Sequence, residues 1–278
     1  MSDDPRSLPI PDGWAEALAS WEDLLRAGGA TGPTIATRTD HGRRVARALG
    51  GTPAAVTAAD LLAWVGGQSW ARETRRSVYA SLRSLWRHLL AAGFVESDPT
   101  TALPKVRPAP AHARPIGERA YRRAVAAATG RVALILRLAG EAGLRREEIA
   151  KVHASDLLED LAGRSLVVHG KGGKDRVVPL SDDVARLVAR ECLAGGGWAL
   201  PGGVDGHLSA RYVGKLAADA LASATLHQLR HRFATVAYGG TRDLLAVQLL
   251  LGHTSPATTQ RYVRPPDDAL RAAMLAAC

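Results

Sequence analysis

The chain has 278 residues, of which 46% are hydrophobic and 23% charged, with a formal net charge of +9; this length favours two modest domains and the composition is that of a globular protein. The acidic, proline-broken N-terminus does not resemble a signal peptide, and no run approaches the roughly 20 apolar residues of a membrane helix. The two isolated cysteines, Cys192 and Cys278, form no zinc pattern and fit a reducing compartment, so we expect a cytoplasmic protein with no membrane association, metal or cofactor.

The first part of the chain, residues 12–98, shows helical periodicity interrupted by glycines. It predicts helices over residues 14–27, 33–49, from Thr57 onward, and 72–92. Thr57 and Asp60 are spaced nearly as in a capping box. The last helix has an apolar stripe made of Val78, Leu82, Leu85, Trp86 and Leu89. We expect a helical domain with a basic outer face, because residues 24–95 contain ten Lys and Arg against three Asp and Glu.

A proline-rich segment follows, over residues 99–116. Five prolines between Pro99 and Pro115 should prevent a regular helix and give an extended, semi-rigid linker. Its basic residues are Lys105, Arg107 and Arg114. We place the domain boundary in this segment.

The second domain, residues 117–278, is predicted to be mainly α with one small β hairpin. Two valine-rich runs between Ser165 and Leu180 flank a Gly-Lys-Gly-Gly-Lys tip, which predicts the hairpin. Helices are expected over residues 118–129, 131–143, 182–194, 209–222, 226–238, 243–251 and 256–263. Two basic domains suggest a polyanionic partner, although a protein from an arginine-rich proteome would carry the same charge.

Three segments of this domain carry residues suited to phosphate chemistry. Arg145 follows Gly143 at the start of a helix, and Lys171 lies at the hairpin tip. His227 and Arg230 share a helical face at i,i+3 spacing. His253 follows a glycine-terminated helix, and Tyr262 lies nine residues further on a short helix that Ser255-Pro256 begins. Each feature alone is more often structural or solvated than functional, so only their combination is informative.

Taken together, the strings AGLRREEI, GKGGKDRVVPL, HQLRHRFAT and LLGHTSPATTQRYV resemble the active-site motifs of the tyrosine recombinase family, which includes phage integrases and XerC/XerD-type enzymes. The resemblance covers essentially the whole second domain. The helical first domain resembles the SAM-like core-binding domain of the family more loosely. Ala142 replaces a threonine that many members carry, and Arg146 is an unusually bulky neighbour of the first arginine, but no reacting group is lost.

The resemblance implies DNA cleavage through a covalent 3′-phosphotyrosine, without metal or ATP. Tyr262 would be the nucleophile, Arg145 and Arg230 would hold the phosphate oxygens, and His227 would accept the tyrosine proton. Lys171 would protonate the leaving 5′-oxygen. His253 would hydrogen-bond a phosphate oxygen or the nucleophile, and Glu148 would orient Arg145 or His227.

The implied partner is double-stranded DNA with a specific short recombination site. Expected DNA contacts, mostly to phosphate, come from Arg72, Arg75, Arg76, Arg83, Lys105, Arg107 and Lys174. The resemblance implies monomers in solution that form a homotetramer on two duplexes, and a directionality factor is compatible with it. The tail, residues 267–278, could pack on a neighbour or on its own domain.

The biological role is predicted less sharply. The core-binding domain starts about 12 residues from Met1, so we expect no additional arm-binding domain, simple recombination sites and an integrase of a phage or other mobile element. XerC/XerD-type resolution of chromosome or plasmid dimers is the alternative. A type IB topoisomerase-like enzyme fits the separate DNA-binding domain and HQLRH string less well. A catalytically silent DNA-binding protein would not need all six reacting residues.

Overall fold

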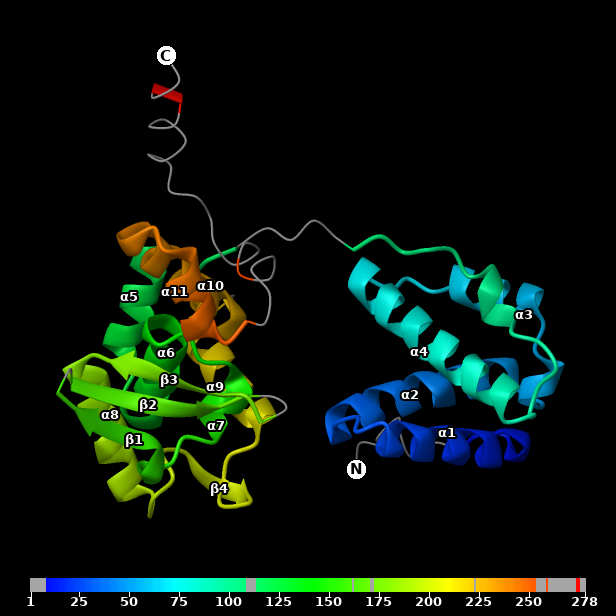
Figure 1. The fold of residues 1–278 in the computed structure, drawn as a ribbon, viewed down its shortest axis with the longest axis horizontal. Coiled ribbons are helices and arrows are strands. Elements are labelled where there is room, and N and C mark those ends of the chain that lie inside the picture. The colour runs from blue at the N-terminus through cyan, green and yellow to red at the C-terminus, as the bar shows by residue number, and fades with distance from the viewer. Residues whose placement is uncertain are drawn as a thin grey trace. The chain divides into compact units, whose positions relative to one another are not determined.

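The chain divides into two units, Met1–Pro110 and Ala111–Cys278, which are called unit 1 and unit 2 below (Figure 1). The computed structural model describes residues 9–108, 114–161, 163–170, 173–222, 224–253, 259 and 274–275. The described elements are mostly helices, and unit 2 adds a small antiparallel sheet. The predicted mainly α fold class is therefore confirmed.

Unit 1 is helical. After the 3-10 helix η1 (Asp12–Trp14), its elements are α1 (Ala15–Ala27), α2 (Gly32–Leu49), η2 (Pro53–Ala55), α3 (Ala58–Gly66) and α4 (Arg72–Ala91). The capping box at α3 is real: the Asp60 amide donates to Thr57 Oγ1 over 3.2 Å, and the Thr57 amide donates to Asp60 Oδ2 over 3.1 Å. The apolar stripe of α4 packs into a core that includes the fully buried Trp14, Trp21 and Trp86.

The first residues of the expected linker belong to unit 1. Pro99–Ala102 form the 3-10 helix η3, begun by Asp98, whose Oδ1 accepts from the Thr100 amide over 2.8 Å. Leu103 is buried in the unit 1 core. The expectation of an extended linker starting at residue 99 was wrong here, because a side-chain cap and an apolar anchor outweigh the proline content. The division between the units falls between Pro110 and Ala111.

Unit 2 begins with α5 (Glu118–Ala127), α6 (Gly130–Glu141) and α7 (Arg146–Ala150). After the 3-10 helix η4 (Ala154–Asp156) comes the sheet, whose strands are β1 (Leu157–Asp160), β2 (Gly163–His169) and β3 (Asp175–Leu180). The hairpin β2–β3 was predicted and is present, with His169 opposite Asp175. Strand β1 was not predicted; it pairs antiparallel with β2, so the order is β1-β2-β3.

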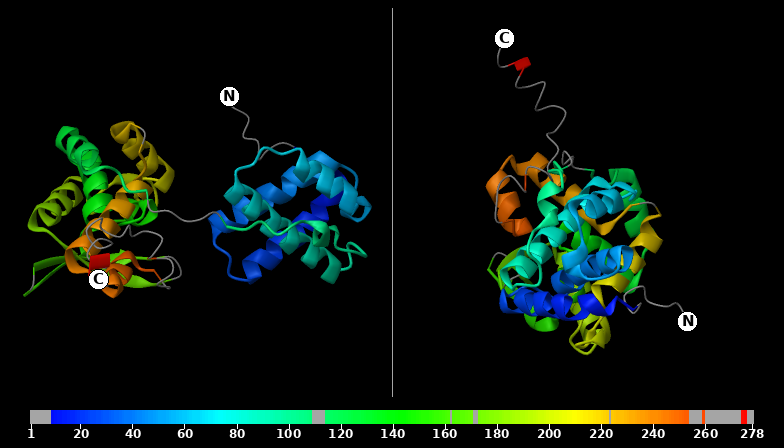
Figure 2. Two further views of the ribbon diagram at one scale, coloured as in Figure 1. Left: turned by 90° about the horizontal axis from the view of Figure 1, so that it is seen from above. Right: turned by 90° about the vertical axis from the view of Figure 1, so that its right-hand side faces the viewer.

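The remaining described elements of unit 2 are α8 (Asp182–Ala194), β4 (Pro201–Val204), α9 (Ala210–Leu221), α10 (Leu226–Thr241) and α11 (Leu244–Leu251). The three-stranded sheet lies along one side of the helices, as two perpendicular views show (Figures 1 and 2). The core centres on α6, whose Leu134, Ile135, Leu136 and Leu138 are fully buried. The helices α7, α10 and α11 and strand β3 meet beside this core and carry the candidate active site.

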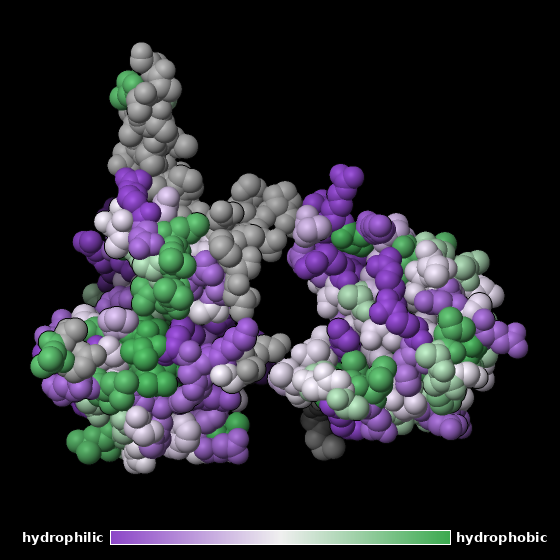
Figure 3. Space-filling model, in the orientation of Figure 1, coloured by the Kyte–Doolittle hydropathy of each residue, from purple (hydrophilic) through white to green (hydrophobic). Residues whose placement is uncertain are grey.

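The surface of unit 2 has an apolar area over α10 and α11 (Figure 3), where Val236, Leu245 and Leu249 are exposed. The helix expected over residues 256–263 and most of the tail 267–278 lie outside the described residues. Among the described helices, none combines the length and the apolar character that crossing a bilayer requires.

Candidate active site

Arg145 lies at the junction of α6 and α7, where the chain turns sharply. Gly143 precedes it with φ +68°, a left-handed conformation that glycine adopts without a Cβ penalty. The Arg145 backbone amide donates to Glu148 Oε2 over 2.7 Å, and its Nη1 donates to Glu148 Oε1 over 2.8 Å. The Arg145 side chain is still 41% exposed. Glu148 therefore orients a guanidinium that solvent, or a ligand, can reach.

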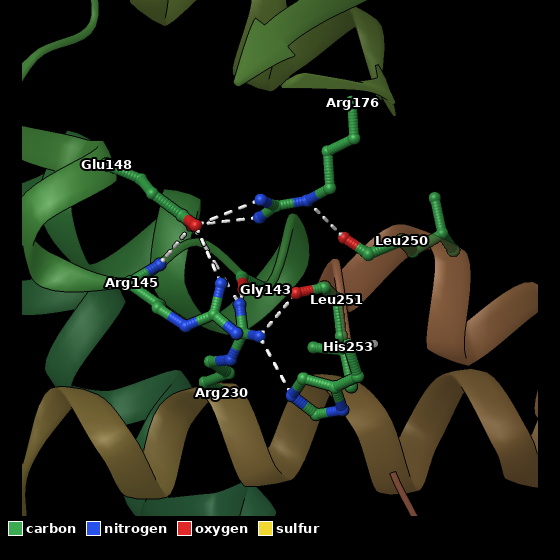
Figure 4. Close-up of polar contacts among 8 residues, drawn as sticks. All are labelled: Gly143, Arg145, Glu148, Arg176, Arg230, Leu250, Leu251 and His253. Atoms are coloured by element: carbon green, nitrogen blue, oxygen red, sulfur yellow. Dashed lines mark hydrogen bonds and ion pairs between the residues drawn. The ribbon is translucent and has the colours of Figure 1, made fainter. Parts of the chain in front are cut away.

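Glu148 is the centre of a charged network (Figure 4). Its side chain is only 4% exposed. Besides Arg145, it binds Arg176 of β3 through two parallel bonds, from Nη1 to Oε1 over 2.9 Å and from Nη2 to Oε2 over 2.8 Å. Burial alone would raise the pKa of Glu148, but the hydrogen bonds from Arg176 and from the Arg145 amide outweigh it and lower the pKa to about 2. The carboxylate is ionised.

Arg230 of α10 is almost fully buried, with 2% of its side chain exposed. Its Nη1 donates to the carbonyl oxygen of Gly143 and lies 3.9 Å from Glu148 Oε2. Its Nη2 donates to the carbonyl oxygen of Leu251 over 2.6 Å. Arg230 thereby joins the turn before α7 to the C-terminal end of α11, where a helix has a partial negative charge.

His253 follows that end of α11, after Gly252 in a left-handed conformation. Its Nε2 lies 3.1 Å from Arg230 Nη2, which can only donate, so Nε2 accepts. The ring proton is therefore on Nδ1, which donates to Thr259 Oγ1 over 3.0 Å. Burial and the charges of Arg230 and Arg145 lower the pKa of His253 to about 3. The ring is neutral near pH 7.

His227 lies one turn before Arg230 on α10 and is exposed. Its ring meets that of His231 edge to face, with centroids 4.7 Å apart. Partial burial lowers the pKa of His227, and the nearby charges of Arg230 and Arg145 lower it further. A neutral imidazole beside two guanidiniums can accept a proton near neutral pH.

Beside this network, unit 2 contains a cavity of about 500 Å³. Arg145, His227 and Arg230 line it together with Leu144, Arg146, Glu147, Arg211, Gly214, Ala218, Thr225 and Leu226. In the network of Figure 4, three guanidiniums and one carboxylate leave a net charge of +2 while His253 is neutral. The arrangement can bind an anion and stabilise negative charge that builds up on it.

The structure brings together five of the predicted site residues, namely Arg145, Glu148, His227, Arg230 and His253. Lys171 and Tyr262 lie outside the described residues. The expectation for Glu148 was that it orients Arg145 or His227, and the observed hydrogen bonds go to Arg145. Sequence reasoning missed Arg176, although it lies inside the string GKGGKDRVVPL. The signal available was an arginine next to the apolar run Val177 to Leu180 of the strand.

The predicted DNA-contacting residues differ in their surroundings. Arg75 donates from Nη1 to the Val65 carbonyl over 3.0 Å and from Nη2 to the Gln68 carbonyl over 2.7 Å. Arg83 Nη2 donates to the Leu103 carbonyl over 2.7 Å. These two arginines hold the end of α3 and the segment after η3. Backbone carbonyls thus occupy part of their donors, and DNA contact by Arg75 and Arg83 stays a prediction.

The other predicted cations remain on the surface. Arg76 pairs with Glu73, Nε to Oε2, over 3.0 Å. Arg72, Lys105, Arg107 and Lys174 are exposed. Surface pairs such as Arg76–Glu73 contribute little to stability and exchange partners readily. These five residues stay candidates for phosphate contacts. Over the part of the chain that the structure describes, no cluster of three or more His, Cys, Asp or Glu side chains could hold a metal ion.

Fold and site together define a helical unit with a cavity lined by arginines and a histidine, which suits the binding of an anionic group. Residues 118–268 match the model of the phage integrase family. The tyrosine recombinase XerD of Caulobacter vibrioides is 35% identical over 224 residues, which are 70% of this chain and 71% of that protein. XerD of Rhizobium meliloti is 30% identical over 236 residues, 75% of each chain. The chain belongs to the phage integrase family and is a tyrosine recombinase, an enzyme of the kind that cuts and rejoins DNA.

Solved structures agree on the fold. A lambda integrase tetramer bound to a Holliday junction superposes with a TM-score of 0.74 at 18% identity, covering 91% of this chain and 78% of that one. The XerH recombinase in a post-cleavage complex with difH substrate gives 0.67 at 17% identity, covering 97% and 91%. Such low identities speak for a shared fold alone, which is the one expected from the motifs.

Proposed function

We propose that this protein is a site-specific recombinase that cleaves DNA through a covalent 3′-phosphotyrosine at Tyr262. The observation that carries the proposal is the convergence of Arg145, Arg230 and His227 on one cavity, with Glu148 buried behind them. A phosphodiester placed there would meet a net positive charge that is already in position. Such preorganised charge is the largest contribution to many enzymatic rate enhancements.

In the proposed cleavage step, the Tyr262 oxygen attacks the scissile phosphorus. A P–O bond to tyrosine forms, the P–O5′ bond breaks, and a 3′-phosphotyrosine and a 5′-hydroxyl result. The phosphoester energy is conserved, so a 5′-hydroxyl of another strand can attack the phosphotyrosine and rejoin DNA without ATP. Arg145 and Arg230 supply the positive charge that a metal ion would supply elsewhere.

Two proton transfers accompany this step. Tyr262 has an ordinary pKa near ~10 and must lose its proton on attack. His227 is the proposed acceptor, because its lowered pKa keeps the ring neutral and it lines the same cavity. Lys171, in the chain segment that joins β2 to β3, is the proposed donor to the leaving 5′-oxygen. Neutral His253 would donate its Nδ1 proton to a non-bridging phosphate oxygen, or hydrogen-bond the Tyr262 oxygen, by rotating away from Thr259.

The proposed partner is double-stranded DNA carrying a short recombination site. The structurally similar lambda integrase was solved as a dimer bound to a core site and as a tetramer bound to a Holliday junction. We infer that this chain likewise acts as a homotetramer on two duplexes, assembled from monomers, with or without a directionality factor. Arg72, Arg76, Lys105, Arg107 and Lys174 are the proposed phosphate contacts, which makes binding sensitive to salt.

The test is adduct formation on nicked duplexes. Wild-type protein with labelled DNA in EDTA should give a covalent complex on a denaturing gel. Tyr262→Phe should bind the same DNA with unchanged affinity and give no complex, because only the attacking oxygen is lost. DNA flanking the gene is the first substrate, followed by a random-sequence library. An adduct that survives in Tyr262→Phe would shift the role to another tyrosine, with Tyr238 and Tyr212 the next candidates.

For the biological role we propose integration of a phage or other mobile element, with Xer-type dimer resolution as the second candidate. The second is favoured by the XerD and XerC relatives, which are 30–36% identical to this chain. Sequencing the DNA captured in covalent adducts from cells decides between them. A site beside the gene itself, at the edge of a mobile element, indicates integration. A single chromosomal site far from the gene indicates dimer resolution.

A further inference from the structure

Arg176 joins three elements of unit 2 (Figure 4). It lies on β3, opposite Val168 of β2. Its two terminal nitrogens bind the two oxygens of Glu148 on α7, and its Nε donates to the Leu250 carbonyl of α11 over 2.7 Å. The side chain is only 10% exposed. It does not line the cavity that Arg145 and Arg230 line, so it can act on a bound phosphate only through its neighbours.

The balance of charge in the network depends on Arg176. Glu148 Oε1 accepts from both Arg176 and Arg145, and its Oε2 accepts from Arg176 while lying 3.9 Å from Arg230 Nη1. A buried carboxylate must be compensated by a cation. If Arg176 were absent, Arg145 and Arg230 would have to provide that compensation, and the net charge presented to a phosphate would fall from +2 to +1.

The third contact of Arg176, with the Leu250 carbonyl, lies next to the contact between Arg230 and α11. Leu250, whose carbonyl Arg176 binds, is followed by Leu251, whose carbonyl Arg230 binds. Two arginines from different elements thus hold consecutive carbonyls at the C-terminal end of α11. His253, which contacts Arg230, comes two residues later. The position of His253 is therefore coupled to both guanidiniums.

We propose that Arg176 is a positioning residue for DNA strand cleavage: it compensates the charge of Glu148, so that Arg145 and Arg230 remain available to the phosphate. This inference rests on the proposed function above. It assigns to β3, the second strand of the hairpin, a role in the cleavage step that is separate from that of Lys171. Binding of DNA, which depends on many distant phosphate contacts, should not depend on Arg176.

The first measurement is single-turnover adduct formation by Arg176→Gln, on the duplex that wild-type protein cleaves best in a random-sequence library. The rate should fall about 10- to 100-fold, as is typical when a residue that orients a reacting group is removed. The dissociation constant for the same duplex should change less than about threefold. Arg232→Gln is the matched control. Arg232 is also a poorly exposed arginine of unit 2 with a carboxylate partner, Glu118, and a backbone acceptor, Gly140, but it does not line the cavity.

The decisive measurement is rescue by removal of the opposite charge. If Arg176 compensates Glu148, the double variant Arg176→Gln/Glu148→Gln should cleave at least about fivefold faster than Arg176→Gln, because no uncompensated carboxylate remains to compete for Arg145 and Arg230. Arg176→Lys, which keeps the charge but loses the paired geometry, should fall between wild type and Arg176→Gln. If Arg176→Gln folds poorly, Arg176→Lys takes its place in the test.

The outcomes separate the two proposals. A double variant no faster than Arg176→Gln, or a loss in Arg232→Gln as large as in Arg176→Gln, would mean a purely structural role and overturn the inference. Cleavage by Arg176→Gln at the wild-type rate would overturn it as well. If instead wild-type protein formed no adduct with any duplex of the library, the proposed function itself would fail, and this inference with it.

Discussion

Glu148 is a negative charge held inside the protein, and its environment explains why it is tolerated. Ionised carboxylates are costly to bury unless cations and hydrogen-bond donors surround them. Glu148 has both, in Arg145, Arg176 and the more distant Arg230. Removing one partner of such a buried pair typically costs about 3–5 kcal/mol. The same contacts that make Glu148 tolerable also fix the orientation of the guanidiniums that face the cavity.

His253 should make the stability of unit 2 depend on pH. Its pKa is about 3 in the folded chain against an ordinary value of 6.5, so the unfolded chain takes up a proton first as the pH falls. The stability that neutral His253 contributes is therefore fully present above pH 6.5 and is lost as the pH falls from 6.5 to 3. The free energy of unfolding changes through this group by at most about 1.4 kcal/mol per pH unit.

Chemical denaturation between about pH 5.5 and 6.5 tests this, because Glu148, with its pKa lowered from 4.5 to about 2, does not yet contribute there. As the pH is lowered through this range, the free energy of unfolding should decrease less steeply in His253→Gln than in wild type. Equal slopes in the two proteins would mean that His253 takes up protons equally in the folded and unfolded chains, contrary to the acceptor role of its Nε2.

At the scale of elements, the turn between α6 and α7 depends on Gly143. Its φ is +68°, and a Cβ there would collide with the ring of Phe233. A non-glycine residue in this conformation costs roughly 1–2 kcal/mol before any collision. The carbonyl of Gly143 also accepts from Arg230. Gly143 therefore connects backbone conformation, packing against α10 and the position of a site arginine.

Gly143→Ala should both destabilise unit 2 and slow strand cleavage. Gly196→Ala is a matched control, because Gly196 has φ +64° but no atom within 4 Å of the place that a Cβ would take. Both variants should lower the melting temperature, and Gly143→Ala should also lose about tenfold or more in adduct formation by displacing the Arg230 acceptor. Equal cleavage rates in the two variants would show that the Gly143 carbonyl is dispensable.

Most elements could be predicted from sequence because their ends carry local signals. Gly28, Gly50 and Gly252 follow the ends of α1, α2 and α11, and the Thr57–Asp60 pair begins α3. Strand β1 was missed because its four residues have no strong alternation, and its stability comes from pairing with β2. The helix η3 was missed because a side-chain cap by Asp98 outweighs the prolines around it.

The site was predictable to the extent that motifs mark it. Arg145, His227, Arg230 and His253 are recognisable in their strings, and they do converge. Arg176 was not recognisable, because its meaning depends on Glu148, 28 residues earlier, and on the Leu250 carbonyl, 74 residues later. Likewise, periodicity placed Arg75 and Arg83 on the surface of α4 but could not reveal the carbonyls that bind them.

At the scale of the whole molecule, the two units have separate hydrophobic cores. We therefore expect two unfolding transitions that respond to different substitutions. Trp86→Ala removes a fully buried side chain whose ring meets Trp14 edge to face at 5.8 Å. It should cost unit 1 about 3–5 kcal/mol, which lowers its melting temperature by about 10 °C or more, and leave the transition of unit 2 in place.

Calorimetry measures both transitions, and tryptophan fluorescence assigns them, since five of the six tryptophans lie in unit 1 and only Trp198 lies in unit 2. Leu136→Ala, in the core of unit 2, is the reciprocal substitution and should shift only the other transition. A single transition that moves as a whole in both variants would contradict independent unfolding.

The residues of the site lie far apart in the sequence, and this separation matters while the chain is being synthesised. A series of pairwise contacts joins Gly143, Glu148, Arg176, Arg230 and His253, yet more than a hundred residues separate the first from the last. On the ribosome, the arginines emerge well before the end of α11 that holds two of them. Arg176 and Arg230 can therefore not be fixed in place until the end of α11 has been synthesised and has packed in unit 2. We therefore expect a growing or truncated chain to meet DNA without being able to cut it.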